Sequence, residues 1–479
     1  MSQPDVLLVT IDGLRNDRLS TNGYDRLTSP TLDSLAEIGG ACTTAMSTGT
    51  GTLLSFPGIL TSSYPLMYGG YGQLTEERMP IASEFRRQGY ATLGVNTNAQ
   101  LHPVFGWDRG YDVYIDSGEE YIDEPIGEFS KKSSDDTTQS PLGDTLEKLK
   151  TVTYQTLDNE GLAYRSIEAV YRLINGRELP HPDASDVVDT AVEAAEKLPS
   201  DRPYFLWVHF METHSPYMPP QEYRDQFLQD SISEGRIWQL NDQLHEQPDR
   251  LTDEDVALIS DLYDASLRYL DDELDRLFEE LGVTENTCLA VTADHGEQFR
   301  EHGELTHCSQ PYEEGIHVPL LFDFPEKSLS DIEAVTSTID IAPTLLDAAI
   351  DDVELPENFF GRSLVDALDG DETVTEKRTA LAQLASNPRH NPRDIDPNSR
   401  TTGCRTREWK YATSVAPDKP DLLFHLPEDP GEQHNVIEEH PDVVERFDAL
   451  LQEHYQLPAY TEYDLELDID GEEGAASDD

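Results

Sequence analysis

The order of hydrophobic and polar positions along the chain predicts strands that alternate with helices. Short apolar runs rich in β-branched and aromatic residues predict buried strands at Val6–Ile11, Tyr90–Val95, Phe205–Phe210, Leu289–Thr292 and Val318–Phe322. Amphipathic patterns between them predict helices at Thr31–Ile38, Ile81–Gln88, Ser185–Leu198 and Thr252–Leu281. This alternation favours an α/β fold with a doubly wound, mostly parallel sheet flanked by helices. In such folds, chemistry gathers at the carboxyl edge of the strands.

The pattern changes at about Thr379, where short strands separated by Pro, Asn and Asp turns begin, and a helix follows near Pro441–Tyr455. We therefore expect a large domain over residues 1–378, a small α+β subdomain with a short antiparallel sheet over residues 379–460, and an acidic disordered tail over residues 461–479. Two further stretches, Asp116–Asp144 and Gln221–Arg250, have the composition of loops or insertions and carry no motif.

Charge changes this picture, because 34 basic residues stand against 95 acidic ones and the formal net charge is −61. Such a charge disfavours binding to nucleic acid or to anionic membranes. It is also typical of disorder, but 37% hydrophobic and 8% aromatic residues supply enough material for a large core. We interpret the charge as an adaptation to high salt, where surface carboxylates are screened. The low lysine content, 9 of the 34 basic residues, agrees with this interpretation.

The cysteines and the N-terminus indicate the compartment. The four cysteines contain no CxxC pair and no tight cluster, so neither a disulfide scaffold nor a zinc ribbon is indicated. The sequence MSQPDVLLVTIDG has no basic region typical of a secretory signal, and no apolar run approaches the length needed to span a membrane. We expect a cytoplasmic protein in a high-salt cytosol, without integral membrane association.

Two predicted strands end in a carboxylate. Asp12 follows the first strand in VLLVTIDG, and by itself it is equally well explained as a turn or capping residue before Gly13. The strand near residue 290 also ends in a carboxylate, Asp294, followed directly by His295. Two strand-end carboxylates and an imidazole are suitable ligands for a divalent cation. The pair therefore predicts a metal site.

Hydroxyls and imidazoles follow other predicted elements. The segment Thr48–Pro65 places glycines and hydroxyls before a helix-like run, where a hydroxyl lies in the positive field of the helix N-terminus or simply caps the helix. Among the histidines, His209 falls inside an apolar run and is a core or supporting residue, whereas His214 lies in a Pro-rich loop suited to contact substrate. Three more, His302, His307 and His317, follow the second carboxylate site and are either surface residues or candidates for one functional imidazole.

These residues, in this order, resemble the sulfatase branch of the alkaline phosphatase superfamily. The similar blocks run along nearly the whole chain and include PDVLLVTIDGLRNDRLSTNGY, GILTSSYP, HFMETHSPYMPP, TADHGEQFREHG, PYEEGIHVPLL, TIDIAPTLLD and LLFHLPEDPGEQHNV. The resemblance implies a large doubly wound domain, a small antiparallel C-terminal subdomain, and metal-assisted attack on a sulfate or phosphate ester.

The resemblance also assigns roles. Asp12, Asp294 and His295 are similar to metal ligands, and His214 is similar to the substrate-contacting histidine. Counting back from LTSSYP places Thr52 where sulfatases carry the Cys or Ser of CxPxR or SxPxR, so Thr52 is the expected nucleophile and a further metal ligand, and no formylglycine is expected.

The sequence departs from the sulfatase pattern at three further positions. Phe56 replaces the motif arginine, Gly13 replaces the second aspartate of the calcium-type site, and His307 stands where many sulfatases have a lysine. His307 is therefore a candidate to contact the anion or protonate the leaving oxygen, and Asn98 is a candidate for an ester-oxygen contact. Relatives with a threonine nucleophile use manganese or zinc. We expect one divalent ion, with Mn²⁺ favoured and Ca²⁺, Mg²⁺ or Zn²⁺ as alternatives.

Three functions remain open at this point. The first is a hydrolase that cleaves a sulfate or phosphate ester, on a small molecule or a glycan, through a covalent Thr52 intermediate. The second is a transferase that moves a sulfo- or phospho-group in cell-surface polysaccharide assembly, because a threonine ester must be resolved by an incoming nucleophile, which can be a sugar hydroxyl. The third is a non-catalytic binding protein, which the retained site residues disfavour. The oligomeric state is not indicated by the sequence.

Overall fold

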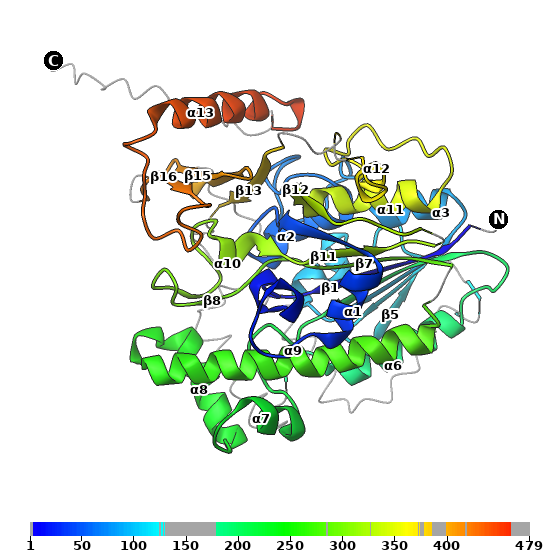
Figure 1. The fold of residues 1–479 in the computed structure, drawn as a ribbon. Helices are drawn as coiled ribbons and strands as arrows, with labels where there is room; N and C mark the ends of the chain where they lie inside the picture. The colour runs from blue at the N-terminus through cyan, green and yellow to red at the C-terminus, as the bar shows by residue number, and fades with distance from the viewer. Residues whose placement is uncertain are drawn as a thin grey trace, which may run out of the picture.

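The computed structural model describes residues 3–123, 179–283, 286–325, 327–371, 378–385, 399–416 and 419–460, together with residues 126, 127, 129 and 373. In this part of the chain a ten-stranded sheet runs in the order β10-β2-β11-β7-β1-β6-β3-β4-β5, with β12 paired to β2 (Figure 1). Its strands are β1 (Asp5–Ile11), β2 (Gly40–Met46), β3 (Ala91–Asn96), β4 (Val113–Asp116), β5 (Glu119–Ile122), β6 (Tyr204–Phe210), β7 (Thr287–Ala293), β10 (His317–Val318), β11 (Leu320–Asp323) and β12 (Ile332–Ser337).

The centre of the sheet is parallel, as predicted. β1 pairs in parallel with β6 and β7, and β3 pairs in parallel with β4 and β6. The prediction of one parallel strand at Val318–Phe322 is wrong: Pro319 separates β10 from β11, and both of these strands run antiparallel to their neighbours. A buried apolar run indicates a strand but does not encode its direction, and proline cannot donate a hydrogen bond to the ladder.

Helices cover both faces of the sheet (Figure 1). Successive residues of β1 alternate between two cores, with Val6 and Leu8 in one and Leu7, Val9 and Ile11 in the other, because side chains of a strand point to opposite faces. The first core is covered by α2 (Thr52–Thr61), α3 (Ile81–Arg87), α11 (Ile341–Ala349) and α12 (Val365–Leu368), and the second by α1 (Pro30–Ile38), α6 (Ala184–Glu196) and α9 (Asp253–Leu281). The doubly wound prediction is confirmed.

Short 3₁₀ helices join several of these elements. They are η1 (Asn16–Arg18), η2 (Ser20–Asn22), η3 (Ala99–Leu101), η4 (Pro103–Phe105), η5 (Pro248–Arg250), η6 (Thr338–Asp340) and η9 (Pro458–Tyr460). The predicted loop at Asp116–Asp144 contains β5 at its start, and residues 130–144 lie outside the described part of the chain.

The prediction of a loop at Gln221–Arg250 is wrong, because this stretch forms α7 (Gln221–Phe227), α8 (Glu234–Glu246) and η5. Helix α8 is polar except for one stripe, Ile237, Leu240 and Leu244, which packs against Val256 and Ile259 of α9. These apolar residues are spaced by three and four positions, as expected for one face of a helix, and the overall polar composition of the stretch does not reveal this spacing.

The C-terminal region forms a separate antiparallel sheet, also as predicted. Its strands are β13 (Ala380–Leu384), β14 (Thr401–Arg405), β15 (Trp409–Ser414) and β16 (Leu422–His425), and α13 (Pro441–Tyr455) packs on it (Figure 1). A buried ion cluster joins this sheet to α10 (Glu313–Ile316): the Lys410 ammonium lies 2.7 Å from Glu313 and 2.9 Å from Glu432. The predicted tail, residues 461–479, lies outside the described residues.

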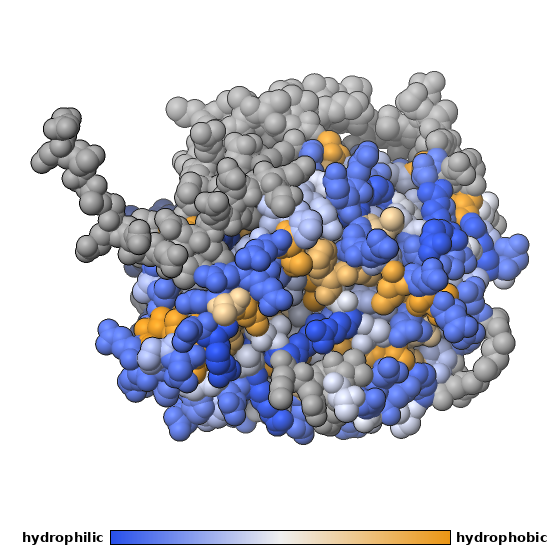
Figure 2. Space-filling view, turned by 90° about the horizontal axis from the view of Figure 1, so that it is seen from above, coloured by the Kyte–Doolittle hydropathy of each residue, from blue (hydrophilic) through white to orange (hydrophobic). Residues whose placement is uncertain are grey.

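The surface of the described residues is predominantly hydrophilic on the face drawn in Figure 2, with apolar residues between hydrophilic ones. Among the described residues, the exposed large hydrophobic side chains are Leu27, Ile38, Met79, Val104, Leu355 and Val415. No helix in the described ranges is both long enough and apolar enough to cross a membrane.

Candidate functional site

The register of the two central strands brings the predicted carboxylates together. Ile11 of β1 pairs with Ala293 of β7, so Asp12 and Asp294 leave adjacent strands at the same carboxyl edge. Backbone groups fix this arrangement, because the Gly13 N–H donates to Asp294 Oδ1 at 3.1 Å and the His295 N–H donates to the same atom at 2.8 Å. All three candidate ligands are fully buried.

Three atoms of this group face one another without hydrogen-bond partners: Asp12 Oδ1, Asp294 Oδ2 and His295 Nε2. His295 Nε2 lies 3.5 Å from Asp12 Oδ1 and 3.6 Å from Asp294 Oδ2, and ligand atoms of all three residues lie within 4.8 Å of one another. His295 Nδ1 lies 2.7 Å from the Gly296 carbonyl, which can only accept, so the proton is on Nδ1 and Nε2 presents a lone pair. Two buried carboxylate oxygens and one imidazole lone pair fit a divalent cation.

Burial and the close charges shift the pKa values of the group in opposite directions. Burial raises the pKa of Asp294, and the neighbouring Asp12 carboxylate raises it further. Burial also opposes ionisation of Asp12, but the imidazoles of His214, His209 and His295 hold the pKa of that carboxyl below its usual range. Asp12 is therefore the carboxylate of the pair that ionises first.

Gly13 explains the loss of the second aspartate of the calcium-type site. Its φ is +72°, and a Cβ at this position would lie 3.0 Å from the Thr213 carbonyl oxygen. A side chain here would be strained by its backbone conformation and crowded by that oxygen. The turn after β1 is thus built for glycine.

Thr52 is the first residue of α2, and its hydroxyl lies beside the carboxylate group. Thr52 Oγ1 donates to Asp12 Oδ2 at 3.2 Å and accepts from the Asn98 side-chain amide at 3.3 Å. The same amide donates to Asp12 Oδ2 at 2.9 Å. Thr52 is only 3% exposed. The structure places Asn98 where it holds both the hydroxyl and the carboxylate.

Phe56 fills the space beside this hydroxyl where the sulfatase motif has arginine. Its ring is fully buried and packs edge-on against Trp107, Trp207 and His209, with a centroid distance of 5.0 Å to the His209 ring. Because a buried guanidinium would need a charged partner that these aromatic rings do not supply, the pocket is matched to an apolar residue.

A hydrogen-bonded chain behind Asp12 supports that carboxylate. The Trp207 indole donates to Thr10 Oγ1 at 2.9 Å, and Thr10 Oγ1 lies 2.9 Å from His209 Nδ1. His209 Nε2 in turn lies 3.6 Å from Asp12 Oδ2. The Thr10 hydroxyl can donate to Nδ1, which also lies 3.2 Å from the Thr10 carbonyl, and Nε2 has no hydrogen-bond partner, so a ring proton on Nε2 would point toward Asp12. His209 is therefore a buried supporting residue, in line with its place in an apolar run.

The other predicted histidines divide into two groups. The His307 ring lies 4.8 Å from the His295 ring and 5.7 Å from the His214 ring, so these residues meet at the site. Desolvation and the neighbouring imidazoles of His295 and His214 lower the pKa of His307. His302 instead stacks on Tyr312 and contacts Glu314, and His317 contacts Asn16 and the Thr43 carbonyl. These two stabilise the fold around the site.

One buried residue near the site was missed at the sequence level. Glu297 is 1% exposed, its Oε2 accepts from the Tyr217 hydroxyl at 2.7 Å, and its Oε1 has no hydrogen-bond partner. Burial raises the pKa of Glu297. Its position two residues after His295 could have indicated that Glu297 lies near the site, but the sequence analysis considered only candidate metal ligands there.

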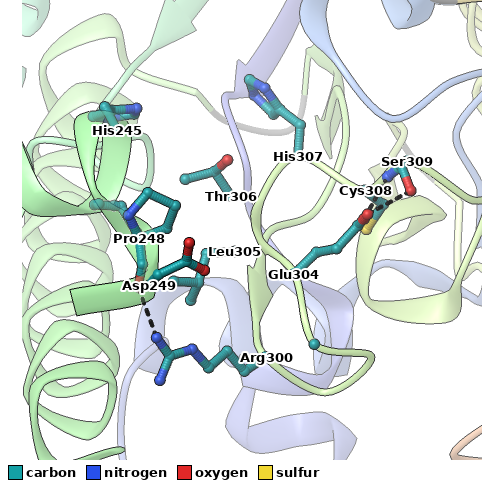
Figure 3. A pocket seen from close by; sticks show the side chains of 12 residues that line it. His245, Pro248, Asp249, Arg300, Glu304, Leu305, Thr306, His307, Cys308 and Ser309 are labelled. Atoms are coloured by element: carbon teal, nitrogen blue, oxygen red, sulfur yellow. Dashed lines mark hydrogen bonds between the residues drawn. The ribbon is translucent and has the colours of Figure 1, made fainter. Parts of the chain in front are cut away.

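A cavity of about 490 Å³ opens beside His307 (Figure 3). Its walls come from the end of α8 and η5 on one side and from residues 300 and 303–309 on the other. The second wall includes the end of the small hairpin formed by β8 (Gln298–Phe299) and β9 (Leu305–Thr306). The sequence did not indicate this cavity, because one wall lies in the stretch expected to be a loop.

Comparison with known families decides what this arrangement belongs to. The family model named Sulfatase matches residues 4–351. The chain belongs to the sulfatase family. A second model, N-sulphoglucosamine sulphohydrolase, C-terminal, matches residues 301–457. The sulfatase matches run from β1 through the last strand of the main sheet and then into the C-terminal sheet.

Two curated relatives illustrate how far the likeness extends. The chain is 24% identical to an arylsulfatase of Clostridium perfringens over 391 residues, which cover 77% of this chain and 79% of that protein. It is 28% identical to arylsulfatase K of Gallus gallus over 299 residues, and the match spans 50% of that protein. The family and these relatives support assignment to the sulfuric ester hydrolases.

Solved structures show the same fold over nearly the whole length. BT4656, solved in complex with its substrate D-glucosamine-2-N,6-O-disulfate, aligns with a TM-score of 0.67 at 17% identity, covering 97% of this chain and 99% of that one. Phosphonate monoester hydrolase of Agrobacterium radiobacter aligns with a TM-score of 0.68 at 19% identity, covering 95% and 96%. At these identities the likeness concerns the fold.

Proposed function

We propose that this sulfatase hydrolyses sulfate monoesters with Thr52 as its nucleophile. The observation that carries the proposal is the position of Thr52 Oγ1, which lies at the N-terminus of α2, donates to Asp12 and accepts from Asn98. A hydroxyl so placed is oriented by two side chains and lies in the positive field of a helix N-terminus, which favours both an alkoxide and an approaching anion.

The reaction takes place in two displacements at sulfur. In the first, the Thr52 hydroxyl releases its proton to solvent, Thr52 Oγ1 attacks, and the bond from sulfur to the alcohol oxygen breaks. The departing oxygen takes a proton from His214, while His307, which lines the cavity and is neutral because its pKa is lowered, can donate a ring N–H hydrogen bond to that oxygen. In the second displacement, water gives one proton to His214 as its oxygen attacks sulfur, the bond from sulfur to Thr52 breaks with return of the Thr52 alkoxide, and sulfate leaves after losing its remaining proton to solvent.

Asp12, Asp294 and His295 would hold one divalent cation, with the Thr52 hydroxyl beside it. When bound there, the cation supplies a Lewis acid that favours the alkoxide and neutralises charge on the ester oxygens. The donor set of two carboxylates and one imidazole suits Mn²⁺ best and does not exclude Ca²⁺, Mg²⁺ or Zn²⁺. No formylglycine is needed, because Thr52 supplies the hydroxyl directly.

The charge of the site favours sulfate over a phosphate monoester. Two carboxylates and one divalent cation sum to no net charge, and the groups that hold the pKa of Asp12 down are the imidazoles of His214, His209 and His295. Phe56 supplies none of the positive charge that an arginine would bring. A sulfate monoester carries one negative charge, whereas a phosphate monoester carries nearly two at neutral pH. Binding the second charge would require a further cation.

Transfer to an acceptor is the second candidate, and Thr52 itself favours it. A threonine ester cannot collapse by elimination as a formylglycine sulfate hemiacetal does, so an incoming oxygen must resolve it. A sugar hydroxyl in the cavity beside His307 can take the place of water. The product then distinguishes the two functions: free sulfate for the hydrolase, a new sulfate ester for the transferase.

Both functions are tested with the purified protein and 4-nitrophenyl sulfate in concentrated KCl. We expect nitrophenol and free sulfate in equal amounts without any acceptor, loss of turnover after chelation, and recovery with Mn²⁺. Nitrophenol release that depends on an added sugar, with sulfate appearing on that sugar, would identify the transferase. No turnover under any of these conditions would exclude both.

A further inference from the structure

The cavity beside His307 is enclosed by two walls that come from distant parts of the chain. Figure 3 shows His245, Pro248 and Asp249 on one side and Glu304, His307 and Ser309 on the other. Its volume of about 490 Å³ lies in the range typical of small-molecule sites, and it is large enough for a sugar residue.

The proposed reaction places the alcohol part of the substrate in this cavity. His307 lies on the cavity wall and also within ring contact of His295 and His214. Because His307 borders both the carboxylate site and the cavity, the alcohol part of an ester bound at the site extends along this wall. This step rests on the proposed function.

The cation on the cavity wall is already engaged. The Arg300 guanidinium donates from Nη2 to the Pro248 carbonyl at 2.9 Å and to the Leu251 carbonyl at 2.8 Å, and its Nη1 lies 3.5 Å from Asp253. Arg300 therefore ties the hairpin to η5. Among the described residues that line the cavity it is the one arginine or lysine.

The remaining charged groups on the walls are acidic. Asp249 projects from η5, and Glu304 lies on the other wall, where its carboxylate turns toward Ser309 and accepts from the Ser309 N–H at 3.0 Å and from the Ser309 hydroxyl at 2.7 Å (Figure 3). A second anionic group on the alcohol would meet these two carboxylates, while the Arg300 guanidinium is already held by two backbone carbonyls. Sugar hydroxyls, in contrast, can donate to carboxylate oxygens.

We propose that this cavity selects an uncharged, polyhydroxylated alcohol, a sugar that carries one sulfate, and discriminates against a second sulfate or carboxylate on the same unit. Asp249 and Glu304 act as specificity-determining residues: they accept hydrogen bonds from sugar hydroxyls and repel a second anion. The preference differs from that of BT4656, whose substrate in the crystal is a disulfated glucosamine.

The test compares matched pairs of substrates. The first comparison is between 4-nitrophenyl sulfate and its ring-carboxylated derivative. The second is between neutral hexoses that carry one sulfate, at each position in turn, and D-glucosamine-2-N,6-O-disulfate. At about 0.1 M KCl, where repulsion extends over about 10 Å, we expect kcat/KM to be about tenfold lower for the substrate with the second anion, and we expect this ratio to shrink as KCl is raised to about 1 M.

Variants assign the discrimination to the two carboxylates. Asp249→Asn and Glu304→Gln should each reduce the ratio within a pair to about threefold or less. Asp230→Asn removes an equal charge from an exposed position outside the cavity lining and should leave the ratio unchanged.

The outcomes separate this inference from the proposed function. Equal kcat/KM within each pair, a ratio that survives both variants, or turnover of nitrophenyl sulfate with none of the neutral hexose sulfates would overturn the specificity inference and leave the hydrolase intact. Absence of turnover on 4-nitrophenyl sulfate itself would overturn the proposed function.

Discussion

At the scale of single residues, the site shows which predictions a sequence can support. Asp12, Asp294 and His295 were predicted to lie together because strand ends meet at one edge of a parallel sheet, and the structure brings their ligand atoms within 4.8 Å of one another. Thr52 was proposed from its spacing to LTSSYP, and the structure places its hydroxyl beside Asp12. Glu297 escaped notice because no motif demands it, and the chain Trp207–Thr10–His209 escaped because hydrogen bonds between neighbouring strands depend on register.

The hydrogen bonds that join Trp207, Thr10 and His209 predict an effect on metal binding. Thr10→Val keeps the shape of the side chain but removes the hydroxyl that fixes the His209 ring, so Asp12 loses a supporting donor. We expect affinity for Mn²⁺, measured by calorimetry, to fall about tenfold, the usual effect of removing a group that supports a ligand.

The control for Thr10→Val is Thr344→Val, which removes an equally buried hydroxyl from α11, where it donates to the Asp340 carbonyl. This variant should lose stability without losing metal affinity. His209→Gln, whose amide can still donate to Asp12, should retain more affinity than His209→Ala. Equal Mn²⁺ affinities in the wild-type protein and all of these variants would contradict the role of Thr10 and His209 in supporting Asp12.

At the scale of secondary structure elements, helices with strong hydrophobic periodicity were predictable, whereas the direction of each strand was not. The long helix α9 was expected at Thr252–Leu281 and begins at Asp253, with Thr252 as its N-cap. The antiparallel course of β11 and the helices α7 and α8 were missed. The apolar run of β11 carries no directional signal, and α8 has one narrow apolar stripe among polar residues, which composition hides.

The N-terminus of α9 makes a quantitative prediction. The Thr252 hydroxyl accepts from the Asp255 N–H at 3.2 Å, and the Asp255 carboxylate accepts from the Thr252 N–H at 3.0 Å, which is a complete capping box. Thr252→Ala should lower the free energy of unfolding by about 1 kcal/mol.

Chemical denaturation measures this change. Thr190→Ala serves as the control, because its exposed hydroxyl donates within α6 to the Asp186 carbonyl and caps nothing. That variant should be close to neutral. A loss of equal size in both variants would show that the capping box makes no special contribution to α9.

At the scale of the whole molecule, charge and site impose opposite demands. A net charge of −61 repels an anionic ester, yet the site must bind one. The site meets this demand locally, with the N-terminus of α2, several imidazoles and a cluster suited to a divalent cation. The face drawn in Figure 2 is mostly hydrophilic. The alternation of strands and helices was predictable because the pattern of each element is local, whereas the antiparallel pairing of β11 and the cavity, which both join distant segments, were not.

The charge predicts that stability depends on salt. Repulsion between surface carboxylates extends over about 10 Å at 0.1 M salt and over about 3 Å at 1 M. The midpoint of thermal unfolding should therefore rise steeply as KCl is added over this range. Sucrose at matched osmolality, which stabilises proteins without screening charge, should raise it much less. Equal stabilisation by sucrose, or none by KCl, would contradict the interpretation of the composition.

The central claim is that Thr52 forms the covalent intermediate, and mass spectrometry of the enzyme quenched during turnover of 4-nitrophenyl sulfate tests it most directly. We predict a peptide that carries one added SO₃ group on Thr52. Thr52→Val should lose this adduct and at least about a thousandfold in kcat, whereas Thr50→Val, which removes a hydroxyl bonded to the Cys308 carbonyl, should retain the adduct. An adduct on another side chain, or full turnover by Thr52→Val, would contradict the account.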